Sequence, residues 1–168
     1  KFLFRDGSDN YFEDNDERTV FFSKGVLETV KKLGWAPDLI HCNGWFSSLV
    51  PLYVRTGYKH SPIFNNAKII YSLYNDTFAE SFKTGFEKKV IMNGIEESDF
   101  GYYTGGDYVS LNKGAIDRSD ALIIESPDVN PELLDYAKAS GKPILDYQGE
   151  EEYFAAYNEF YDKIIGED

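Results

Sequence analysis

The chain has 168 residues and a formal net charge of −12, because 29 acidic residues outnumber 17 basic ones. This length supports one domain with a core of its own, whereas the negative charge, with no run of Lys or Arg, disfavours nucleic acid or an anionic membrane surface as a partner. No apolar stretch reaches the roughly 20 residues that span a bilayer, and a single Cys excludes an internal disulfide, so we expect a cytoplasmic protein.

The sequence pattern predicts alternating helices and strands. Helices are predicted where apolar residues recur every three or four positions between capping and terminating residues, and buried strands where a few apolar residues run together. In chain order, the predicted elements are a loop at 1–13, a helix at 17–33 closed by Gly34, a strand at 37–42, a helical segment at 45–55 with Pro51 near its first turn, strands at 68–73 and 121–125, a helix at 131–140 closed by Gly141, a weaker strand at 143–146 and a helix at 150–165.

Strands that alternate with helices at this spacing form a parallel sheet covered on both faces. We therefore predict an open α/β, Rossmann-like fold. In such sheets ligands bind beyond the carboxyl ends of the strands. The segments expected to gather around a ligand are those after three predicted strands, at 41–45, 74–78 and 125–128.

Several common ligand-binding motifs are absent from the chain. No Gly-x-Gly-x-x-Gly follows a strand and no Gly-x-x-x-x-Gly-Lys-[Ser/Thr] occurs, which disfavours dinucleotide and P-loop sites. The run Gly105-Gly106-Asp107 favours a turn over a phosphate cradle. With two His residues in all and no adjacent carboxylate in a ligand pattern, no metal site is predicted.

A set of short motifs occurs in a fixed order between about Glu13 and Tyr136. The motifs are Asp14-Asn15-x-x-Arg18, Phe21-Phe22-Ser23-Lys24-Gly25-Val26-Leu27-Glu28, Leu33-Gly34-Trp35-x-Pro37-Asp38-Leu39-Ile40-His41-x-x-x-Trp45, Leu49-Val50-Pro51-Leu52-Tyr53, Asn112-Lys113-Gly114-Ala115-Ile116 and Ser119-Asp120-Ala121-Leu122-Ile123-Ile124-Glu125-Ser126-Pro127. In this order and spacing they resemble the N-terminal domain of bacterial glycogen and starch synthases.

The resemblance implies a GT-B glycosyltransferase, in which two Rossmann-like domains face a cleft. Such an enzyme transfers glucose from ADP-glucose to an α-1,4-glucan and needs no metal or other cofactor. The chain would then be one N-terminal domain over residues 1–168, lacking the first strand or strands and without the second GT-B domain. Its expected partners are a glucan or a nucleotide-sugar, together with a second GT-B domain or subunit.

The chain departs from the family pattern where the sugar is handled. The segment from His41 nearly reproduces the family's His-x-His-Asp-Trp motif, but Asn43 stands at the second His, which contacts the glucosyl group, and Gly44 stands at the Asp. The run from Ser72 to Asp76, Ser-Leu-Tyr-Asn-Asp, replaces the family's Thr-Ile-His-Asn. Asn can orient a sugar hydroxyl but cannot titrate near neutral pH. Whether this chain is itself an active enzyme therefore stays open.

The candidate site residues come from the resemblance and from their positions at strand and helix ends. The substrate-binding candidates are Asp14, Asn15, Arg18, His41, Asn43 and Trp45, of which Asp14 and His41 are the candidates for a catalytic role. Each has a structural alternative. Asp14 and Arg18 can form a local ion pair, His41 can be a hydrogen-bonded residue at a strand end, and Trp45 can be a packing aromatic.

Two functions from different classes remain open. The first is a glycogen or starch synthase type glucosyltransferase, in which this chain acts with a second domain or subunit. The second is a non-catalytic domain derived from a synthase, which binds glucan or regulates a true synthase. Glucose transfer by the full natural polypeptide distinguishes the two.

Overall fold

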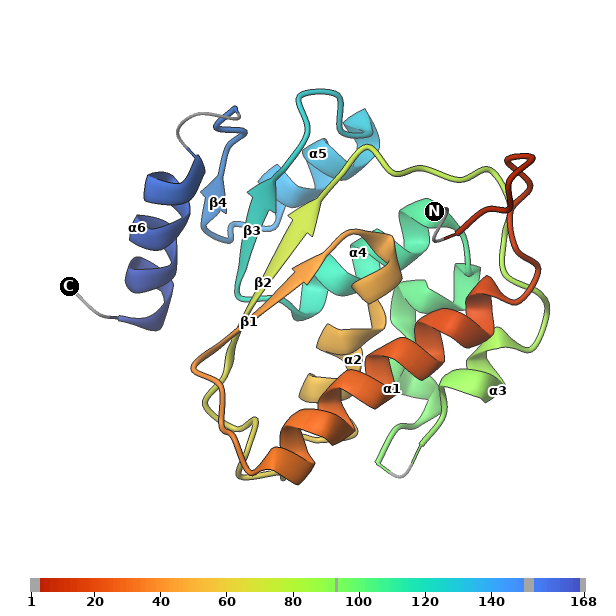
Figure 1. The fold of residues 1–168 in the computed structure, drawn as a ribbon, viewed down its shortest axis with the longest axis horizontal. Helices are drawn as coiled ribbons and strands as arrows, with labels where there is room; N and C mark the ends of the chain where they lie inside the picture. The colour runs from red at the N-terminus through yellow and green to blue at the C-terminus, as the bar shows by residue number, and fades with distance from the viewer. Residues whose placement is uncertain (1–3, 93, 150–152, 167–168) are drawn as a thin grey trace.

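The computed structural model describes residues 4–92, 94–149 and 153–166, which form a parallel sheet between layers of helices (Figure 1). The sheet has four strands in the order β1-β2-β3-β4, so each strand pairs with its neighbour in the sequence. The strands are β1 (Leu39–Asn43), β2 (Lys68–Leu73), β3 (Ala121–Ile124) and β4 (Ile144–Leu145). The α-helices are α1 (Asn15–Leu33), α2 (Leu49–Arg55), α3 (Phe86–Val90), α4 (Tyr108–Arg118), α5 (Pro131–Ala139) and α6 (Tyr153–Ile165), and the 3-10 helices are η1 (Trp45–Ser47), η2 (Glu97–Asp99) and η3 (Gly101–Gly105). The predicted α/β fold with a parallel sheet is confirmed.

Successive residues of the central strands point to opposite faces of the sheet. Tyr71 and Leu122 belong to a large core between the sheet and α2, α4 and α5, whereas Ile70 and Ile123 belong to a smaller core that Phe160 of α6 completes. β2 and β3 are buried along almost their whole length, as parallel strands covered on both faces are. Figure 1 shows α6 on one side of the sheet and α2 and α4 on the other, so helices on both faces are confirmed.

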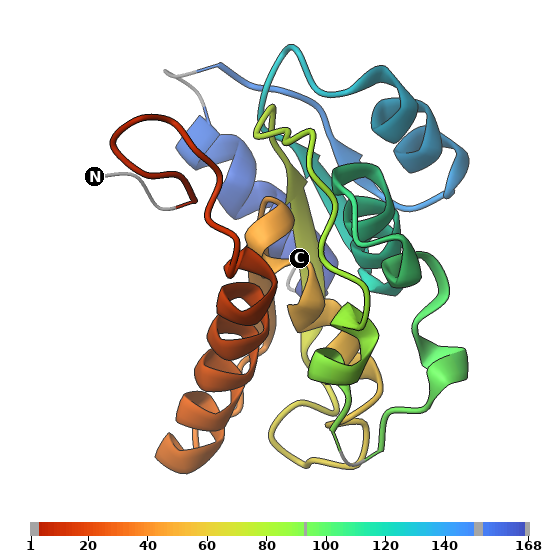
Figure 2. The same cartoon turned by 90° about the vertical axis from the view of Figure 1, so that its right-hand side faces the viewer.

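The first helix forms an outer layer that packs on α2 (Figure 2). α1 ends at Leu33, and Gly34 follows it with a φ of 66°, the left-handed conformation that commonly closes a helix. The predicted end of this helix is confirmed. In the described part of the chain, no helix is both long and apolar enough to cross a membrane.

The sequence pattern fails to predict α3 and α4. α4 begins at a capping box, in which the Asp107 carboxylate accepts from the Ser110 backbone amide at 2.9 Å. Gly114 interrupts its middle, and Gly lowers helix propensity. A Cβ on Gly114 would lie 2.6 Å from Cε2 of Tyr103. The close contact with this ring therefore requires Gly at position 114. The same Gly weakens the helical pattern of the sequence, so the pattern does not predict α4.

β2 matches its predicted limits, and the limits of the remaining elements shift by a few residues. The segment predicted to be helical at 45–55 divides into η1 and α2, with Pro51 in the first turn of α2 as expected. The described part of the predicted N-terminal loop contains an isolated antiparallel bridge between Arg5 and Tyr11. Of the helix predicted at 150–165, residues 150–152 lie outside the described residues.

Candidate functional site

The loops that follow β1, β2 and β3 meet at the carboxyl edge of the sheet, as predicted. Parallel pairing brings the three strand ends side by side. The Tyr74 hydroxyl donates to Asn43 Oδ1 at 3.1 Å, and the Asn75 backbone amide donates to Ser126 Oγ at 3.2 Å. We call the polar side chains at or near this edge the edge cluster, which consists of His41, Asn43, Ser72, Tyr74, Asp76 and Glu125.

His41 is held by hydrogen bonds at both ring nitrogens. Nε2 lies 2.6 Å from Ser72 Oγ, and Nδ1 lies 2.7 Å from the hydroxyl of Tyr161 on α6. Burial lowers the pKa of His41, and the nearby Glu125 carboxylate opposes this effect. The imidazole is therefore neutral near neutral pH. This geometry favours the structural interpretation of His41, while its contact with a ligand stays a prediction.

Two tyrosines of α6 cover the side of the edge cluster on which His41 lies. The rings of Tyr157 and Tyr161 stand edge-on to the imidazole, with ring centroids 6.1 and 5.7 Å away. Burial, reinforced by the negative charge of Glu125, raises the pKa of Tyr74 to about 12 and the pKa of Tyr157 further still. These hydroxyls therefore stay protonated at neutral pH and act as hydrogen-bond donors or acceptors, without a charge.

The loop after β1 contacts a carboxylate from the loop after β2. Gly44 has φ 64° and ψ 178°, a backbone conformation that favours Gly. A Cβ at this position would overlap Asp76 Oδ2 and lie 3.4 Å from Asp76 Cγ. Burial raises the pKa of Asp76, and its Oδ1 is buried without a hydrogen-bond partner in the structure. A carboxylate thus lies beside Gly44, although the motif position itself carries none.

Of the three candidate residues at the start of α1, Asp14 and Arg18 lie at the surface and Asn15 lies in the protein interior. Asp14 Oδ1 lies 2.7 Å from Arg18 Nε, and both side chains are about half exposed. This ion pair lowers the pKa of Asp14. Asn15 is fully buried, and its Nδ2 donates to the Phe4 carbonyl at 2.9 Å. The structure therefore forms the predicted local pair and places Asn15 inside the protein, where it ties the N-terminal loop to α1.

Trp45 and Cys42 lie in the core. The indole of Trp45 is 1% exposed and packs between Phe4 and Phe78, with ring centroids 4.7 and 4.8 Å away. Burial raises the pKa of the Cys42 thiol to about 12, so its reactive thiolate does not form near neutral pH. Trp45 fits its packing interpretation, and as placed its ring offers no open surface to a sugar.

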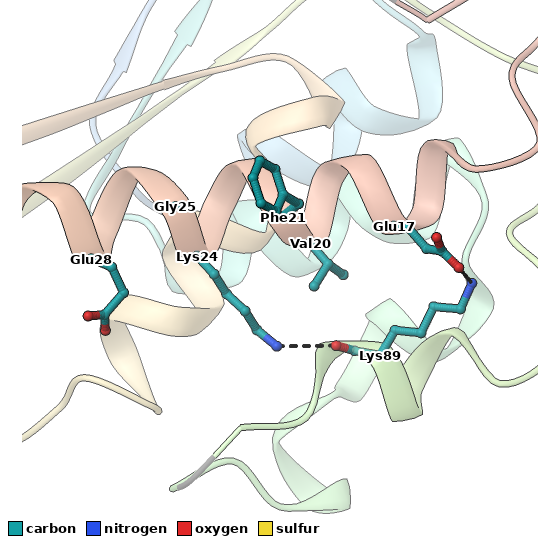
Figure 3. A pocket seen from close by; sticks show the side chains of 7 residues that line it. All are labelled: Glu17, Val20, Phe21, Lys24, Gly25, Glu28 and Lys89. Carbon is teal, nitrogen blue, oxygen red and sulfur yellow. Dashed lines mark hydrogen bonds and ion pairs between the residues drawn. The ribbon is translucent and has the colours of Figure 1, made fainter.

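Two surface grooves lie along α1, away from the edge cluster. Figure 3 shows one groove of about 510 Å³, lined by Glu17, Val20, Phe21, Lys24, Gly25, Glu28 and Lys89. Its charged groups already have partners, because Lys24 Nζ donates to the Lys89 carbonyl at 3.2 Å and Lys89 Nζ lies 2.9 Å from Glu17. The exposed walls of this groove are apolar, and none of its residues is a predicted site residue.

Sequence reasoning did not single out several residues that the structure brings to the site. Tyr74 and Asp76 lie in the segment expected after a buried strand, so their position was a usable signal. Tyr161 lies 120 residues from His41, and no local pattern indicates that contact. Among the residues that the structure describes, no three His, Cys, Asp or Glu side chains gather closely enough to hold a metal ion.

Comparison with known proteins supports the family resemblance that the sequence motifs indicate. The family model described as "Starch synthase catalytic domain" matches residues 1–146. The glycogen synthase of Clostridium perfringens is 33% identical over 127 residues, which cover 71% of this chain and 25% of the relative. That of Elusimicrobium minutum is 33% identical over 137 residues, which cover 78% of this chain and 27% of the relative. The chain therefore spans about a quarter of the length of these curated relatives.

A solved structure shares the fold. The catalytic domain of starch synthase IV from Arabidopsis thaliana, bound to ADP and acarbose, superimposes with a TM-score of 0.63. The match has 19% sequence identity and covers 82% of this chain and 30% of that chain. This similarity confirms the predicted half of a GT-B fold. The ordered motifs, the parallel sheet and the family match over most of the sequence agree, and the chain belongs to the starch synthase catalytic domain family.

Proposed function

We propose that the chain supplies the sugar-binding surface of a glycogen or starch synthase type glucosyltransferase, and that the edge cluster contacts the sugar. The observation that carries this proposal is the meeting of the loops after three strands, where the Tyr74 hydroxyl donates to Asn43 and the Asn75 backbone amide donates to Ser126. Open α/β sheets bind their ligands at this position. Family membership supports a glycosyltransferase of the starch synthase type, and the resemblance implies that the reaction is glucose transfer from ADP-glucose to an α-1,4-glucan.

The chemistry of the edge cluster suits a ligand rich in hydroxyl groups. Asn43 is exposed and carries both donors and an acceptor. Tyr74 offers a hydroxyl that stays protonated, and the carboxylate of Glu125 is an acceptor. Neutral and acidic groups of this kind orient sugar hydroxyls and do not attract a phosphate. We infer that this surface contacts the glucan or the transferred glucosyl group.

The nucleotide part of the donor requires a different surface. A departing ADP needs cationic stabilisation, whereas Asp76 and Glu125 are acidic and His41 is kept neutral by burial. The starch synthase IV domain of similar fold was solved with both ADP and acarbose bound, which supports a nucleotide and a sugar chain as ligand classes. We therefore assign the diphosphate to a second GT-B domain or subunit that faces this one.

A non-catalytic glucan-binding or regulatory domain is the second candidate. Two observations favour it. Asn43, which cannot titrate near neutral pH, stands where the family has His, and both ring nitrogens of His41 are engaged by neighbouring hydroxyls. In this case the edge cluster binds glucan, but the protein transfers no glucose.

The deciding experiment uses the full natural polypeptide, radiolabelled ADP-glucose and glycogen, with maltoheptaose binding measured in parallel by calorimetry. Glucose incorporation supports the enzyme, and maltoheptaose binding without incorporation selects the non-catalytic domain. Absence of both overturns the proposal for the edge cluster.

A matched pair of variants locates the binding surface. Tyr74→Phe removes the hydroxyl that donates to Asn43 and should weaken maltoheptaose binding about fivefold, within the range for one lost hydrogen bond. Lys68→Ala alters an exposed side chain at the opposite, amino end of the same strand and should leave binding unchanged. Equal effects of the two variants would exclude the carboxyl edge as the contact surface.

A further inference from the structure

The helical segment after β1 begins without a side-chain cap of its own. Gly44 stands at the N-cap of η1 and has no side chain to accept a hydrogen bond, whereas the family motif has Asp at this position. The first backbone amides of a helix have no acceptor within the helix, and an Asp at the N-cap normally accepts one of them. The amides at the start of η1 therefore require another acceptor.

Asp76 fills the space beside Gly44 from the neighbouring strand. Its Oδ2 lies too close to Gly44 to leave room for the Cβ of any other residue at position 44. Burial raises the pKa of Asp76, and the nearby Tyr108 hydroxyl and Trp45 backbone amide oppose this effect, although the Tyr108 hydroxyl itself donates to the Tyr74 carbonyl at 2.7 Å. The carboxylate is thus close to the first amide of η1.

A second contact joins the same two loops. Asn43 stands at the second His of the family motif, and Tyr74 lies in the segment that replaces the family's Thr-Ile-His-Asn. The Tyr74 hydroxyl donates to Asn43 Oδ1 at 3.1 Å. Each departure after β1 therefore contacts a departure after β2. Contacts of this kind between the two loops indicate a rebuilt edge, in which Asp76 Oδ1 is the buried atom left without a hydrogen-bond partner among the described residues.

We propose that Asp76 is a positioning residue that replaces the motif carboxylate, caps the segment beginning at Trp45 and thereby holds Asn43 toward the ligand. In this proposal the carboxylate comes from the loop after β2 instead of the loop after β1, and it occupies the space beside position 44. This inference rests on the proposed function, because the orientation of Asn43 matters only if the edge cluster binds a sugar.

Hydrogen exchange of the backbone segment that contains Trp45, measured in the full natural polypeptide, tests the capping contact. Asp76→Ala should raise the exchange rate of this segment about tenfold, the size expected when a helix loses its cap. Asp76→Asn should stay within about twofold of the natural protein, because the amide oxygen of Asn also caps helices. Asp128→Ala is the matched control, since it removes an exposed carboxylate from the loop after β3 and should change nothing here.

Maltoheptaose binding separates this inference from the proposed function. The apparent Kd should rise in Asp76→Ala in inverse proportion to the capped fraction that remains, because only the capped state presents Asn43, and Asp76→Asn should restore it. If the natural protein does not bind maltoheptaose, the proposed function fails, while hydrogen exchange still tests the cap. Unchanged exchange in Asp76→Ala overturns the positioning role even where binding persists.

Discussion

The two faces of the sheet differ in what holds them together. The six bulkiest fully buried side chains, Trp45, Tyr53, Tyr71, Tyr103, Phe64 and Phe100, all belong to the core on the side of α2, α4 and α5. On the other face, the buried residue that α6 contributes is Phe160. That thinner face carries His41 and its contact with Tyr161. Stability is thus concentrated on one face, and the polar groups near the site lie on the other.

This difference indicates which part of the molecule can open locally without global unfolding. A region held by few buried apolar contacts opens at a lower free energy than the global unfolding. α6 meets this description, since most of its residues are partly or fully exposed. We expect α6 to exchange its amides faster than α4, although α4 is the shorter helix.

Neighbouring residues of β3 provide the strongest test of this comparison. Leu122 and Ile123 are both fully buried but point to opposite faces. Leu122→Ala should lower the free energy of unfolding by about 3–5 kcal/mol, and Ile123→Ala by about 2–3 kcal/mol, because the cost of a cavity falls where the surroundings can collapse. Urea denaturation measures both. Equal losses would show that α6 packs as rigidly as the opposite layer.

Packing on the larger face also predicts the effect of adding a single methyl group. Gly114→Ala places a Cβ within 2.6 Å of the buried Tyr103 ring, so either the ring or α4 must move. Overpacking of this kind costs about 1–3 kcal/mol, although Ala on its own favours helix more than Gly. Gly25→Ala on α1 is the control, because a Cβ there meets nothing within 4 Å, and thermal denaturation should show it as neutral or stabilising. A stabilised Gly114→Ala protein would refute the tight contact.

The same contrast explains how much of the fold was predictable. β2 is matched residue for residue because continuous apolar runs on both faces mark a buried parallel strand. α4 was missed because its inner face includes Asn112, whose Oδ1 accepts from the Tyr71 hydroxyl at 2.7 Å, and because Gly114 serves packing. For Asn112 and for Gly114, the contact that decides the residue type is made with a residue outside α4, and the local sequence pattern contains no information on that contact.

Prediction of the candidate site has the same limit. The rule that ligands bind beyond the carboxyl ends of parallel strands correctly identified the segments that meet at the carboxyl edge. It did not reveal that Asp76 lies against Gly44, because that contact depends on the backbone conformation of two separate loops. The burial of Asn15 likewise follows from its hydrogen bond to the Phe4 carbonyl, which involves a loop without regular structure.

Acidification should weaken the thinner face first. Burial holds the pKa of His41 below its ordinary value, so the unfolded chain takes up a proton at this residue more readily than the folded one. Its contribution to stability is therefore complete above pH of about 6.5 and is lost as the pH falls below that value, by at most about 1.4 kcal/mol per pH unit. Denaturation at pH 7.5 and 5.5 measures the loss.

Two His variants assign this pH dependence. His41→Gln should reduce the loss of stability between these pH values, and α6 should no longer loosen on acidification when followed by hydrogen exchange. His60→Gln, at an exposed position in the loop before β2, should leave both effects in place. If the loss of stability on acidification persists in His41→Gln, other titrating groups cause it. The contact of His41 with α6 would then have no role in the pH dependence.

The smallest change in stability is expected at the start of α1, where the comparison between structural and functional roles is sharpest. Asp14 and Arg18 form an exposed ion pair, and such pairs contribute little to folding. Asp14→Asn should therefore leave the unfolding midpoint unchanged. If Asp14 contacts the ligand, as the family resemblance implies, maltoheptaose or ADP-glucose binding by the full natural polypeptide should weaken about tenfold, as expected for a lost hydrogen bond to a charged group. Glu13, the preceding residue, forms a still more exposed ion pair with Lys83, and Glu13→Gln should affect neither property. Since the two variants remove the same charge from adjacent positions, a difference in binding alone would identify Asp14 as a ligand contact, and equal binding would leave it a surface ion pair.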